Sequence, residues 1–529
     1  MRKLVLISTL CLLVGSSSLM AQSATDKISS FLNLLDKYYI DKVDQDSIVE
    51  EAIKSVLKDL DPHSNYLDHD ALQKSNEQLG GNFEGVGIQF NILNDTIYVV
   101  QTISGGPSES VGIIGGDKIV EIDGEGVAGV GIENEGVIKR LRGEKGSKVE
   151  VKIKRHGDNK LLDFLITRDK IPLFAVDASY MVDDEIGYVR LSRFSATATE
   201  EVRAAIIDLK GQGMKDLILD LTGNGGGYLN EAIALGDEFL SDDKLIVYTE
   251  GRAYPKQEEN AKVKGSFEEG NLVIMIDQNS ASASEIVSGA VQDWDRGLLV
   301  GRRSFGKGLV QRAYYLPDRT AVRITIAKYF TPSGRFIQKP YEGGREAYYK
   351  DNLDRFESGE LFGSTEFEFP DSIKHYTAGK RVVYGGGGIM PDIFVAIDTS
   401  FNSEYIARLS RRGILNRFTL DYVDHNREEL ETKFTNVKEF KAGFEVDEKL
   451  LEELYAYAKN NEVEPKEDED FTNSLPWLSN TIKALVARNI WKSGAYFEIS
   501  NDLNPIYKEA VTTIKDKKLY KKLKIAYNN

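Results

Sequence analysis

A serine at the start of a predicted helix is one group in this chain that could perform nucleophilic chemistry. Residues 280–285 read Ser-Ala-Ser-Ala-Ser-Glu; they follow an apolar run at residues 272–277 and precede apolar side chains at helical spacing. A helix N-terminus favours developing negative charge, so Ser282 is well placed to attack a carbonyl carbon. Ser282 and Glu285 also match a capping box, which only closes the helix end. Both interpretations stay open for this segment alone.

A lysine between two glycines is the candidate base. Residues 304–311 read Ser-Phe-Gly-Lys-Gly-Leu-Val-Gln, with Lys307 twenty-five residues after Ser282. An exposed lysine has a pKa of about 10.4 and stays protonated at neutral pH, so it cannot accept a proton. Desolvation lowers the pKa of a lysine by several units. Gly306 and Gly308 leave room to enclose the side chain, which makes Lys307 a candidate general base.

A glycine-rich turn at residues 222–227 follows the apolar run at residues 217–221 and precedes a helix-like segment at residues 228–240. Backbone N–H groups in such a turn can hold a nucleotide phosphate or an oxyanion. The turn lacks the Gly-Lys-Ser/Thr ending of a phosphate-binding loop and the spacing of a dinucleotide fingerprint. The oxyanion is therefore the favoured ligand.

The histidines do not suggest a rival catalytic centre. None lies in the glycine-rich motifs, and no two have zinc-site spacing: His63, His69, His156, His375 and His425. We interpret them as surface or structural residues. Neither a metal nor a cofactor is predicted.

An α/β core is predicted to position the candidate groups. Within residues 169–397, strands are expected at 188–191, 217–221, 272–277 and 298–301, and helices at 204–209 and 286–291. Such alternation is typical of an α/β layer with a partly parallel sheet. A chain of 529 residues usually divides into several domains, so a multidomain α/β protein is expected.

A β-rich module is predicted at residues 81–168, where short alternating strands are separated by glycine turns. Residues 105–112, residues 116–124 and the run at residues 85–88 resemble the PDZ domains of bacterial proteases. Glycines let backbone N–H groups converge on a chain-terminal carboxylate, and an open strand edge accepts a peptide as an added strand. The alternative is that these glycines only form tight turns. The predicted substrate-binding residues are Gly85, Val86, Gly87, Ile88, Ile138 and Leu141.

The two ends of the chain are predicted to differ from the core. Residues 1–21 carry a basic pair, an apolar run and small residues, which is the order of an export signal and predicts a periplasmic or secreted protein. The sole cysteine, Cys11, lies inside this segment; lipid attachment there is the weaker alternative, because Leu10 before it is not small. Residues 22–80 and 398–529 are predicted to be helical.

Charge and hydropathy limit the partners. The net charge of −16 disfavours a nucleic-acid partner. No run after the signal approaches about 18 apolar residues, so no membrane anchor is expected once the signal is removed. The N-terminal helices at residues 22–80 either pack on the next domain or form a homodimer, and both remain open.

The motifs together resemble the C-terminal processing (tail-specific) peptidases. The resemblance spans about residues 28–395 and includes residues 220–227, 280–286, 305–311, 329–338 and 386–392. It implies that Ser282 is the nucleophile, that Lys307 is the base and that Gln311 orients the lysine. It also implies an oxyanion hole of the Ala283 N–H and a glycine of the 225–227 turn, with Gly226 and Gly227 as candidates.

Two features qualify this resemblance. Thr222 stands where the family usually has arginine, which puts any salt bridge from that site in doubt without affecting the dyad. On one fully extended strand, Lys307 and Gln311 would lie about 13 Å apart, so a bend at Gly308 is expected.

The predicted function is that of a serine endopeptidase that cleaves exported proteins through a Ser-Lys dyad, with the PDZ-like module binding apolar C-terminal tails. The alternative is an inactive PDZ adaptor that binds peptide tails without cutting them. Presence of Ser282, Lys307 and Gln311 together argues against the adaptor.

Overall fold

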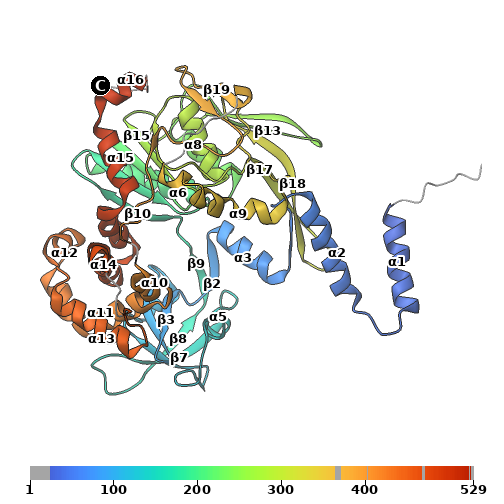
Figure 1. Ribbon diagram of the computed structural model, residues 1–529. Coiled ribbons are helices and arrows are strands. Elements are labelled where there is room, and N and C mark those ends of the chain that lie inside the picture. Colours follow the sequence, from blue (N-terminus) through green and yellow to red (C-terminus); the bar gives the residue numbers. More distant parts are fainter. Residues whose placement is uncertain (1–23, 364–370, 402, 467–470, 524, 526–529) are drawn as a thin grey trace, which may run out of the picture.

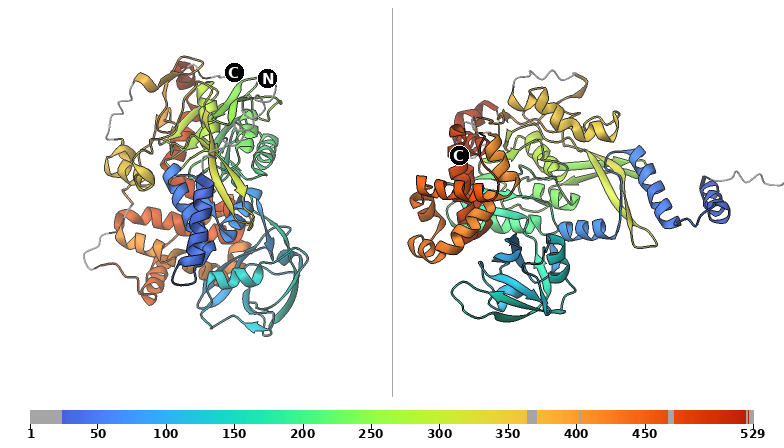
Figure 2. Two further views of the ribbon diagram at one scale, coloured as in Figure 1. Left: turned by 90° about the vertical axis from the view of Figure 1, so that its right-hand side faces the viewer. Right: turned by 60° about the horizontal axis from the view of Figure 1, so that its bottom comes forward.

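The structure is a computed structural model that describes residues 24–363, 371–401, 403–466, 471–523 and 525. The predicted export signal, including Cys11, lies outside the described residues. The described chain forms a central α/β body, a PDZ-like module below it in Figure 1, and a group of helices beside both (Figure 1, Figure 2).

A six-stranded mixed sheet forms the centre of the molecule. Its strands follow the order β10 (Val176–Met181), β11 (Ile186–Leu191), β12 (Asp216–Asp220), β15 (Leu272–Ile276), β16 (Leu298–Gly301) and β21 (Ile393–Phe394). β10 is antiparallel to β11, and the other pairs are parallel. The predicted α/β class is confirmed. Because the carboxyl ends of parallel strands meet at one edge, the loops after β12, β15 and β16 carry the candidate groups to the same edge.

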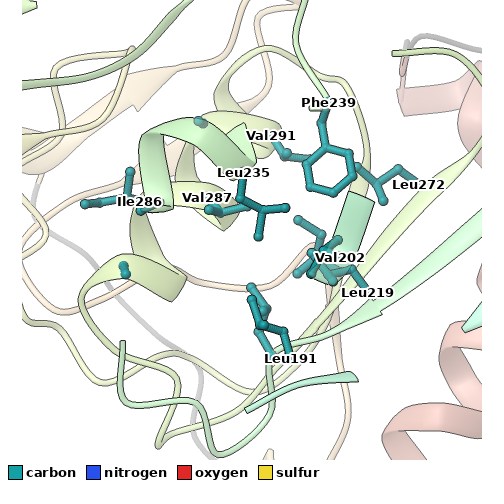
Figure 3. Close-up of a cluster of buried hydrophobic side chains, with 14 of the residues drawn as sticks. Leu191, Val202, Leu219, Leu235, Phe239, Leu272, Ile286, Val287 and Val291 are labelled. Atoms are coloured by element: carbon teal, nitrogen blue, oxygen red, sulfur yellow. The ribbon is translucent and has the colours of Figure 1, made fainter. Parts of the chain in front are cut away.

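Helices cover both faces of this sheet, as a parallel sheet requires. On one face lie α6 (Ala198–Gly211), α7 (Leu229–Asp237) and α8 (Ala283–Asp293), which share an apolar core with the strands. Figure 3 shows Leu219 and Leu272 of the sheet beside Leu235, Phe239 and Val291. On the other face lie α15 (Pro505–Lys515) and α16 (Lys517–Leu523). The last helices therefore belong to the core, whereas the sequence predicted one helical extension from residue 398.

A second sheet flanks the edge that carries the candidate groups. Its long strand β18 (Ala321–Phe330) pairs with β17 (Leu309–Tyr315), β1 (Asn65–Leu67) and β13 (Leu245–Gly251), which in turn pairs with β14 (Tyr254–Asn260). Helix α9 (Gly344–Glu357) and the hairpin of β19 (Lys374–Tyr376) and β20 (Val382–Tyr384) complete this part. Through β1, the N-terminal region contributes a strand next to the candidate site.

The predicted helical N-terminal region is present as α1 (Ala24–Tyr38), α2 (Gln45–Leu60) and α3 (His69–Gly80). No residue of α1 is buried, and Ile28, Phe31 and Leu34 are all more than half exposed. Figure 1 shows α1 standing apart from the rest of the chain. This helix leaves an apolar face without cover from the described residues.

The PDZ-like module has its own sheet and core. The sheet follows the order β3 (Ile88–Leu93), β4 (Thr96–Thr102), β5 (Lys118–Ile122), β7 (Lys148–Lys154) and β8 (Leu162–Thr167), and β6 (Glu125–Gly126) pairs with β5. The module also contains α4 (Pro107–Ser110) and α5 (Asn134–Leu141), and β2 (Asn82–Gly85) pairs with β9 (Asp169–Pro172) where the chain enters and leaves. β3 is an edge strand, which leaves a row of backbone groups for an added strand.

The helices α10 (Glu404–Arg411), α11 (Ile414–Lys433), α12 (Val437–Gly443), α13 (Glu448–Asn460) and α14 (Leu475–Ser500) form a separate apolar core. This helical domain docks on the PDZ-like module: Leu420 packs with Leu93, Tyr98 and Val100, and Lys118 forms an ion pair with Asp424 at 3.5 Å. Within the described residues, none of the helices has the length and apolar character needed to cross a membrane.

Candidate active site

Ser282 lies between the end of β15 and the first turn of α8. Its backbone has φ 57° and ψ −113°, an uncommon conformation for a residue with a side chain. The glycine turn presses against it, because a Cβ at Gly226 would come within 2.8 Å of the Ser282 Cβ. Ser282 thus occupies a sharp strand-to-helix turn that only a glycine could approach so closely.

The buried carboxylate of Glu285 joins the serine segment to the lysine segment. It accepts four hydrogen bonds of 2.5–2.9 Å, from the N–H groups of Ser282, Gly306 and Lys307 and from the Ser304 hydroxyl. Burial raises the pKa of Glu285, and these donors oppose the rise by stabilising the carboxylate. The capping box is present, and the same carboxylate also fixes the backbone of the candidate base. The two interpretations of this segment are therefore compatible.

The environment of Lys307 favours its neutral form. Its pKa falls from 10.5 to about 8; desolvation is the main cause, the charge of Arg323 adds to it, and Glu285 and Asp61 act in the opposite direction. With that pKa, about one lysine in ten is neutral at pH 7. Lys307 can therefore accept a proton at a pH where an exposed lysine cannot.

One pocket of about 640 Å³ brings the predicted residues together. Its lining includes Ser282, Ala283, Lys307, Gln311, Arg323, Tyr329 and the glycines 225–227. The buried Tyr329 adds a second link between the two segments, since its hydroxyl lies 2.6 Å from the Lys307 carbonyl oxygen and 3.1 Å from that of Ser282. Serine, lysine and glycine turn thus face one space large enough for a peptide.

Gln311 and Lys307 do not lie on one extended strand. This agrees with the sequence argument, which excluded such a strand because it would hold the two residues too far apart. β17 begins at Leu309, and its pairing with β18 is irregular between Val310 and Gln311. Gly306 has a left-handed backbone (φ 86°), and residues 303–308 lie outside any strand. The Gln311 amide donates to the Thr325 hydroxyl at 3.4 Å.

The glycine turn offers backbone donors of unequal availability. The Gly226 N–H already donates to the Asn224 side chain at 2.9 Å, so of the two candidate glycines Gly226 is the poorer oxyanion donor. The Ala283 N–H belongs to the first turn of α8, where N–H groups have no partner within the helix. Among the described residues, no hydrogen bond involves the Gly227 N–H. Ala283 and Gly227 are the remaining pair.

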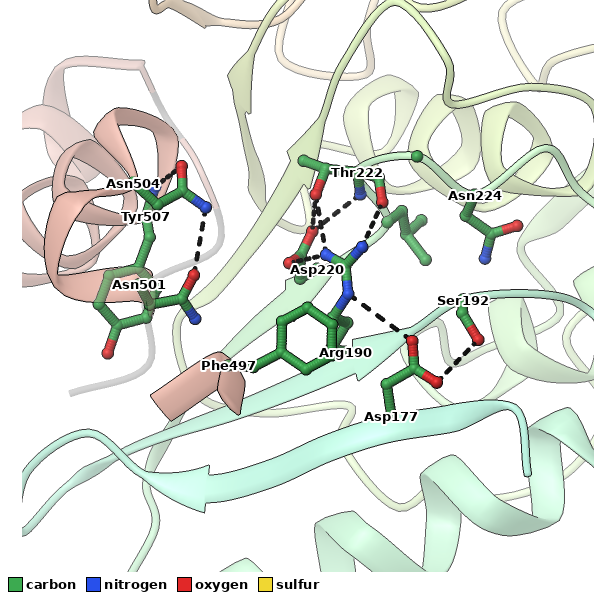
Figure 4. A network of polar contacts seen from close by, with 12 residues as sticks. Asp177, Arg190, Ser192, Asp220, Thr222, Asn224, Phe497, Asn501, Asn504 and Tyr507 are labelled. Carbon is green, nitrogen blue, oxygen red and sulfur yellow. Dashed lines mark hydrogen bonds and ion pairs between the residues drawn. The ribbon is translucent and has the colours of Figure 1, made fainter. Parts of the chain in front are cut away.

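An arginine of the neighbouring strand β11 contacts the turn at Thr222. Arg190 forms an ion pair with the buried Asp220 at 2.5 Å, and its guanidinium also donates to the Thr222 side chain and carbonyl at 3.0 Å (Figure 4). Phe497 of α14 stacks on this guanidinium. Thr222 itself has no charge, and the ion pair at this turn comes from Arg190.

A loop of the N-terminal region lies behind the lysine, which the sequence did not predict. The Asp61 carboxylate accepts from the N–H groups of His63 and Ser64 and from the Thr325 hydroxyl, at 2.8–3.1 Å. The Ser64 hydroxyl in turn accepts from the Thr325 N–H at 3.1 Å. An aspartate followed two and three residues later by such donors is an Asx-turn signal. That signal marks a turn but not its distant partner.

His63 is the histidine whose pKa is affected by the candidate base. Desolvation and the charge of Lys307 lower the pKa of His63 to about 4, so it is neutral at pH 7. Its Nε2 lies 2.9 Å from the Tyr348 hydroxyl. His63 fits the interpretation as a structural residue, and it also lies close enough to Lys307 for the lysine charge to act on its pKa. In the described part of the chain, no group of three or more His, Cys, Asp and Glu residues could hold a metal ion.

The predicted carboxylate loop lies at the start of the edge strand β3. Gly87 has φ 75°, and a Cβ there would meet Ile171 at 3.0 Å, so glycine is needed. Ile138 on α5 is 41% exposed and can contact a ligand, whereas Leu141 is only 4% exposed and belongs to the core of the module. Ile138 is the better placed of the two apolar candidates.

Known protein families match three parts of the chain. Residues 185–343 match Peptidase family S41, residues 85–166 match the PDZ domain, and residues 405–492 match a family of unknown function. The first match covers the α/β body with the candidate site, and the second covers the PDZ-like module. A serine peptidase with a PDZ domain is the class that fold and site define.

Proteins that match this chain over most of their own length identify the particular family. The carboxy-terminal-processing protease of Bartonella bacilliformis is 36% identical over 356 residues, which are 64% of this chain and 80% of that protein. The carboxy-terminal processing protease CtpA of Bacillus subtilis is 34% identical over 344 residues, 63% of this chain and 73% of that protein. The solved photosystem II D1 C-terminal processing protease is 29% identical, with a TM-score of 0.33 over 58% of this chain and 83% of that one. The chain belongs to the carboxy-terminal processing proteases, and the inactive-adaptor alternative is not favoured.

Proposed function

We propose that this protease cleaves peptide bonds through Ser282 and Lys307. The neutral Lys307 amine takes the proton of the Ser282 hydroxyl while the oxygen attacks the carbonyl carbon, and the N–H groups of Ala283 and Gly227 receive the oxyanion. Lys307 then gives its proton to the leaving amine, and water hydrolyses the acyl-enzyme. The observation that carries this proposal is that both side chains line one pocket in which Lys307 has a pKa of about 8.

Gln311 and Asp61 are proposed as positioning residues. Gln311 donates to Thr325, and Thr325 donates to Asp61, whose charge also acts on Lys307. This chain of contacts ties the wall of the pocket to the N-terminal loop. In this proposal Gln311 limits the positions that the lysine side chain can take, and Asp61 anchors the wall behind it.

Replacement of Arg323 by glutamine is expected to move the pH profile of the protease. Loss of a positive charge that lowers the pKa of Lys307 raises that pKa, so the acid limb of kcat/KM should shift upward by about half a unit to one unit. The measurement is kcat/KM for a quenched fluorescent peptide between about pH 6 and pH 10. Arg312→Gln, an exposed change on β17, is the matched control. An unshifted limb would contradict Lys307 as the titrating base.

The PDZ domain is proposed to dock apolar C-terminal tails at residues 85–88. The free edge of β3 and the exposed Ile138 support a tail bound as an added strand, with its last side chain against α5. The upstream segment of the same substrate would then reach Ser282. Apolar tails are the proposed preference because the exposed Ile138 would contact the last side chain of a tail docked in this way.

Amidation of a substrate tail is expected to raise KM about tenfold and to change kcat little, because a charge-assisted set of hydrogen bonds to the carboxylate is lost. Ile138→Asp should weaken binding of free-acid apolar tails in the same way. Short peptides that reach only the pocket around Ser282 should be cleaved equally well by the wild type and by Ile138→Asp. Equal cleavage of amidated and free-acid substrates would contradict the docking role.

Export and dimerisation complete the proposal. The order of residues 1–21 supports an export signal and a periplasmic or secreted location.

The uncovered apolar face of α1 supports a homodimer formed by the N-terminal helices. Sedimentation of the chain with and without residues 24–38 tests the dimer, which should be lost with the helix.

A further inference from the structure

A second large pocket lies where the PDZ domain meets the helical domain. Its volume is about 770 Å³, and it is lined by the end of β3, the start of α5 and the turn between α10 and α11. From the PDZ side come Ile92 and Glu133, and from the helical domain come Arg412, Arg417 and Arg488. The pocket therefore carries three guanidinium groups in a chain whose net charge is −16.

This pocket continues the proposed peptide groove. β3 begins at Ile88, beside the carboxylate loop, and Ile92 near its other end lines the pocket. A peptide added to the free edge of β3 with its carboxylate at residues 85–88 must extend toward Ile92, at about 3.3 Å per residue. Residues about four to six positions before the tail end then reach the pocket.

The three arginines have few partners of their own. Arg417 donates to the Arg412 carbonyl at 3.0 Å, and Arg488 donates to the Asn416 side chain at 2.9 Å. The bonds of Arg412 to the carbonyls of residues 461 and 462 are long, at 3.4 Å. Within the described residues, none of the three pairs with a carboxylate, and the Arg417 Nε has no hydrogen-bond partner. Guanidinium groups so placed can take carboxylates in bidentate fashion.

The opposite wall of the pocket is acidic but exposed. Glu133 and Glu135 stand at the start of α5, and both side chains are open to solvent. They reduce the positive charge of the pocket without neutralising it, since three arginines face two glutamates.

The helical domain is held in place beside the groove by Leu420 and by the Lys118–Asp424 ion pair, so its arginines keep their position relative to β3.

We propose that the helical domain forms a specificity subsite of the PDZ groove, in which Arg412, Arg417 and Arg488 bind acidic side chains located about four to six positions before the C-terminus of the substrate. This inference rests on the proposed docking of C-terminal tails. It assigns a role in substrate selection to residues 405–492, which otherwise match only a family of unknown function.

Tail peptides that differ only upstream test the subsite. Each peptide ends in the same apolar residues and carries either three glutamates or three glutamines at positions four to six from its end. Binding to the full-length Ser282→Ala protein is measured by fluorescence anisotropy. The acidic peptide should bind about five- to tenfold more tightly at low salt, and the difference should shrink at about 0.5 M NaCl.

Two variants with opposite expected effects sharpen the test. Arg412→Gln with Arg417→Gln should remove most of the preference for the acidic peptide, whereas Glu133→Gln with Glu135→Gln should increase it. Arg411→Gln, an exposed change on α10 outside the pocket, is the control and should leave the preference unchanged. Near-ultraviolet circular dichroism of each variant checks that the domain contact is intact.

The outcomes separate this inference from the proposal beneath it. If amidated peptides bind as well as free acids, tail docking itself is wrong. If amidation weakens binding but glutamate and glutamine peptides bind equally, docking stands and the arginine subsite is wrong. If the arginine and glutamate variants change the affinities for the glutamate and glutamine peptides by the same factor, the opposing charges hold the two domains together instead. The subsite is then again wrong.

Discussion

Replacement of Ser282 by alanine is expected to lower kcat for cleavage of casein by at least about ten-thousandfold, because removal of a nucleophile that acts as a unit with its base costs nearly the whole effect of the pair. The fold should persist, since the Ser282 N–H that donates to Glu285 belongs to the backbone and remains in the variant. Release of peptides from casein, followed by chromatography, measures the change. Binding of substrate tails should survive.

The control for this prediction lies on the same helix. Ser288 is buried on α8 and donates to the Ser284 carbonyl at 2.8 Å, but it does not line the pocket. Ser288→Ala should retain most of the activity. Substantial casein cleavage by purified Ser282→Ala would remove Ser282 from the mechanism, and absence of cleavage by the parent protein would revive the adaptor alternative.

Replacement of Lys307 by methionine is expected to lower cleavage about as much as Ser282→Ala does. It is also expected to stabilise the folded protein. Methionine keeps the length of the side chain but cannot accept a proton, so the loss of activity should not add to that of Ser282→Ala. A buried ammonium opposes folding, whereas a thioether does not. Functional residues often carry such a cost in stability.

The pH dependence of this stabilisation follows from the pKa of Lys307. That pKa is about 8 in the folded chain and 10.5 in the unfolded chain, so the destabilisation of the wild type by Lys307 develops as the pH falls from 10.5 to 8 and is complete below pH 8, where both states hold the proton. The gain in Tm of Lys307→Met should therefore be largest below about pH 8 and should shrink as the pH rises toward 10.5. Differential scanning fluorimetry at several pH values measures it. Lys328→Met, an exposed change on β18, should show no such trend.

The sequence predicted the parts of this fold that depend on local pattern. The short apolar runs became β11, β12, β15 and β16 at nearly the expected residues, because a strand buried on both faces needs continuous apolar side chains. The glycine turn and the serine and lysine segments were found from their composition, and strand order then brings their loops to one edge. The PDZ domain and the family also follow from ordered motifs.

The tertiary structure decided how the site is held and which of its donors are free. Nothing in the spacing shows that Glu285 bonds to the backbone of Lys307, that Asp61 stands behind the pocket, or that Arg190 pairs with Asp220 beside Thr222. These contacts join segments far apart in the chain, and their geometry depends on the packing of whole elements. The same reason explains why Gly226 N–H is occupied while Gly227 N–H faces no described partner. Local pattern determines which elements form, whereas long-range packing determines which polar groups meet.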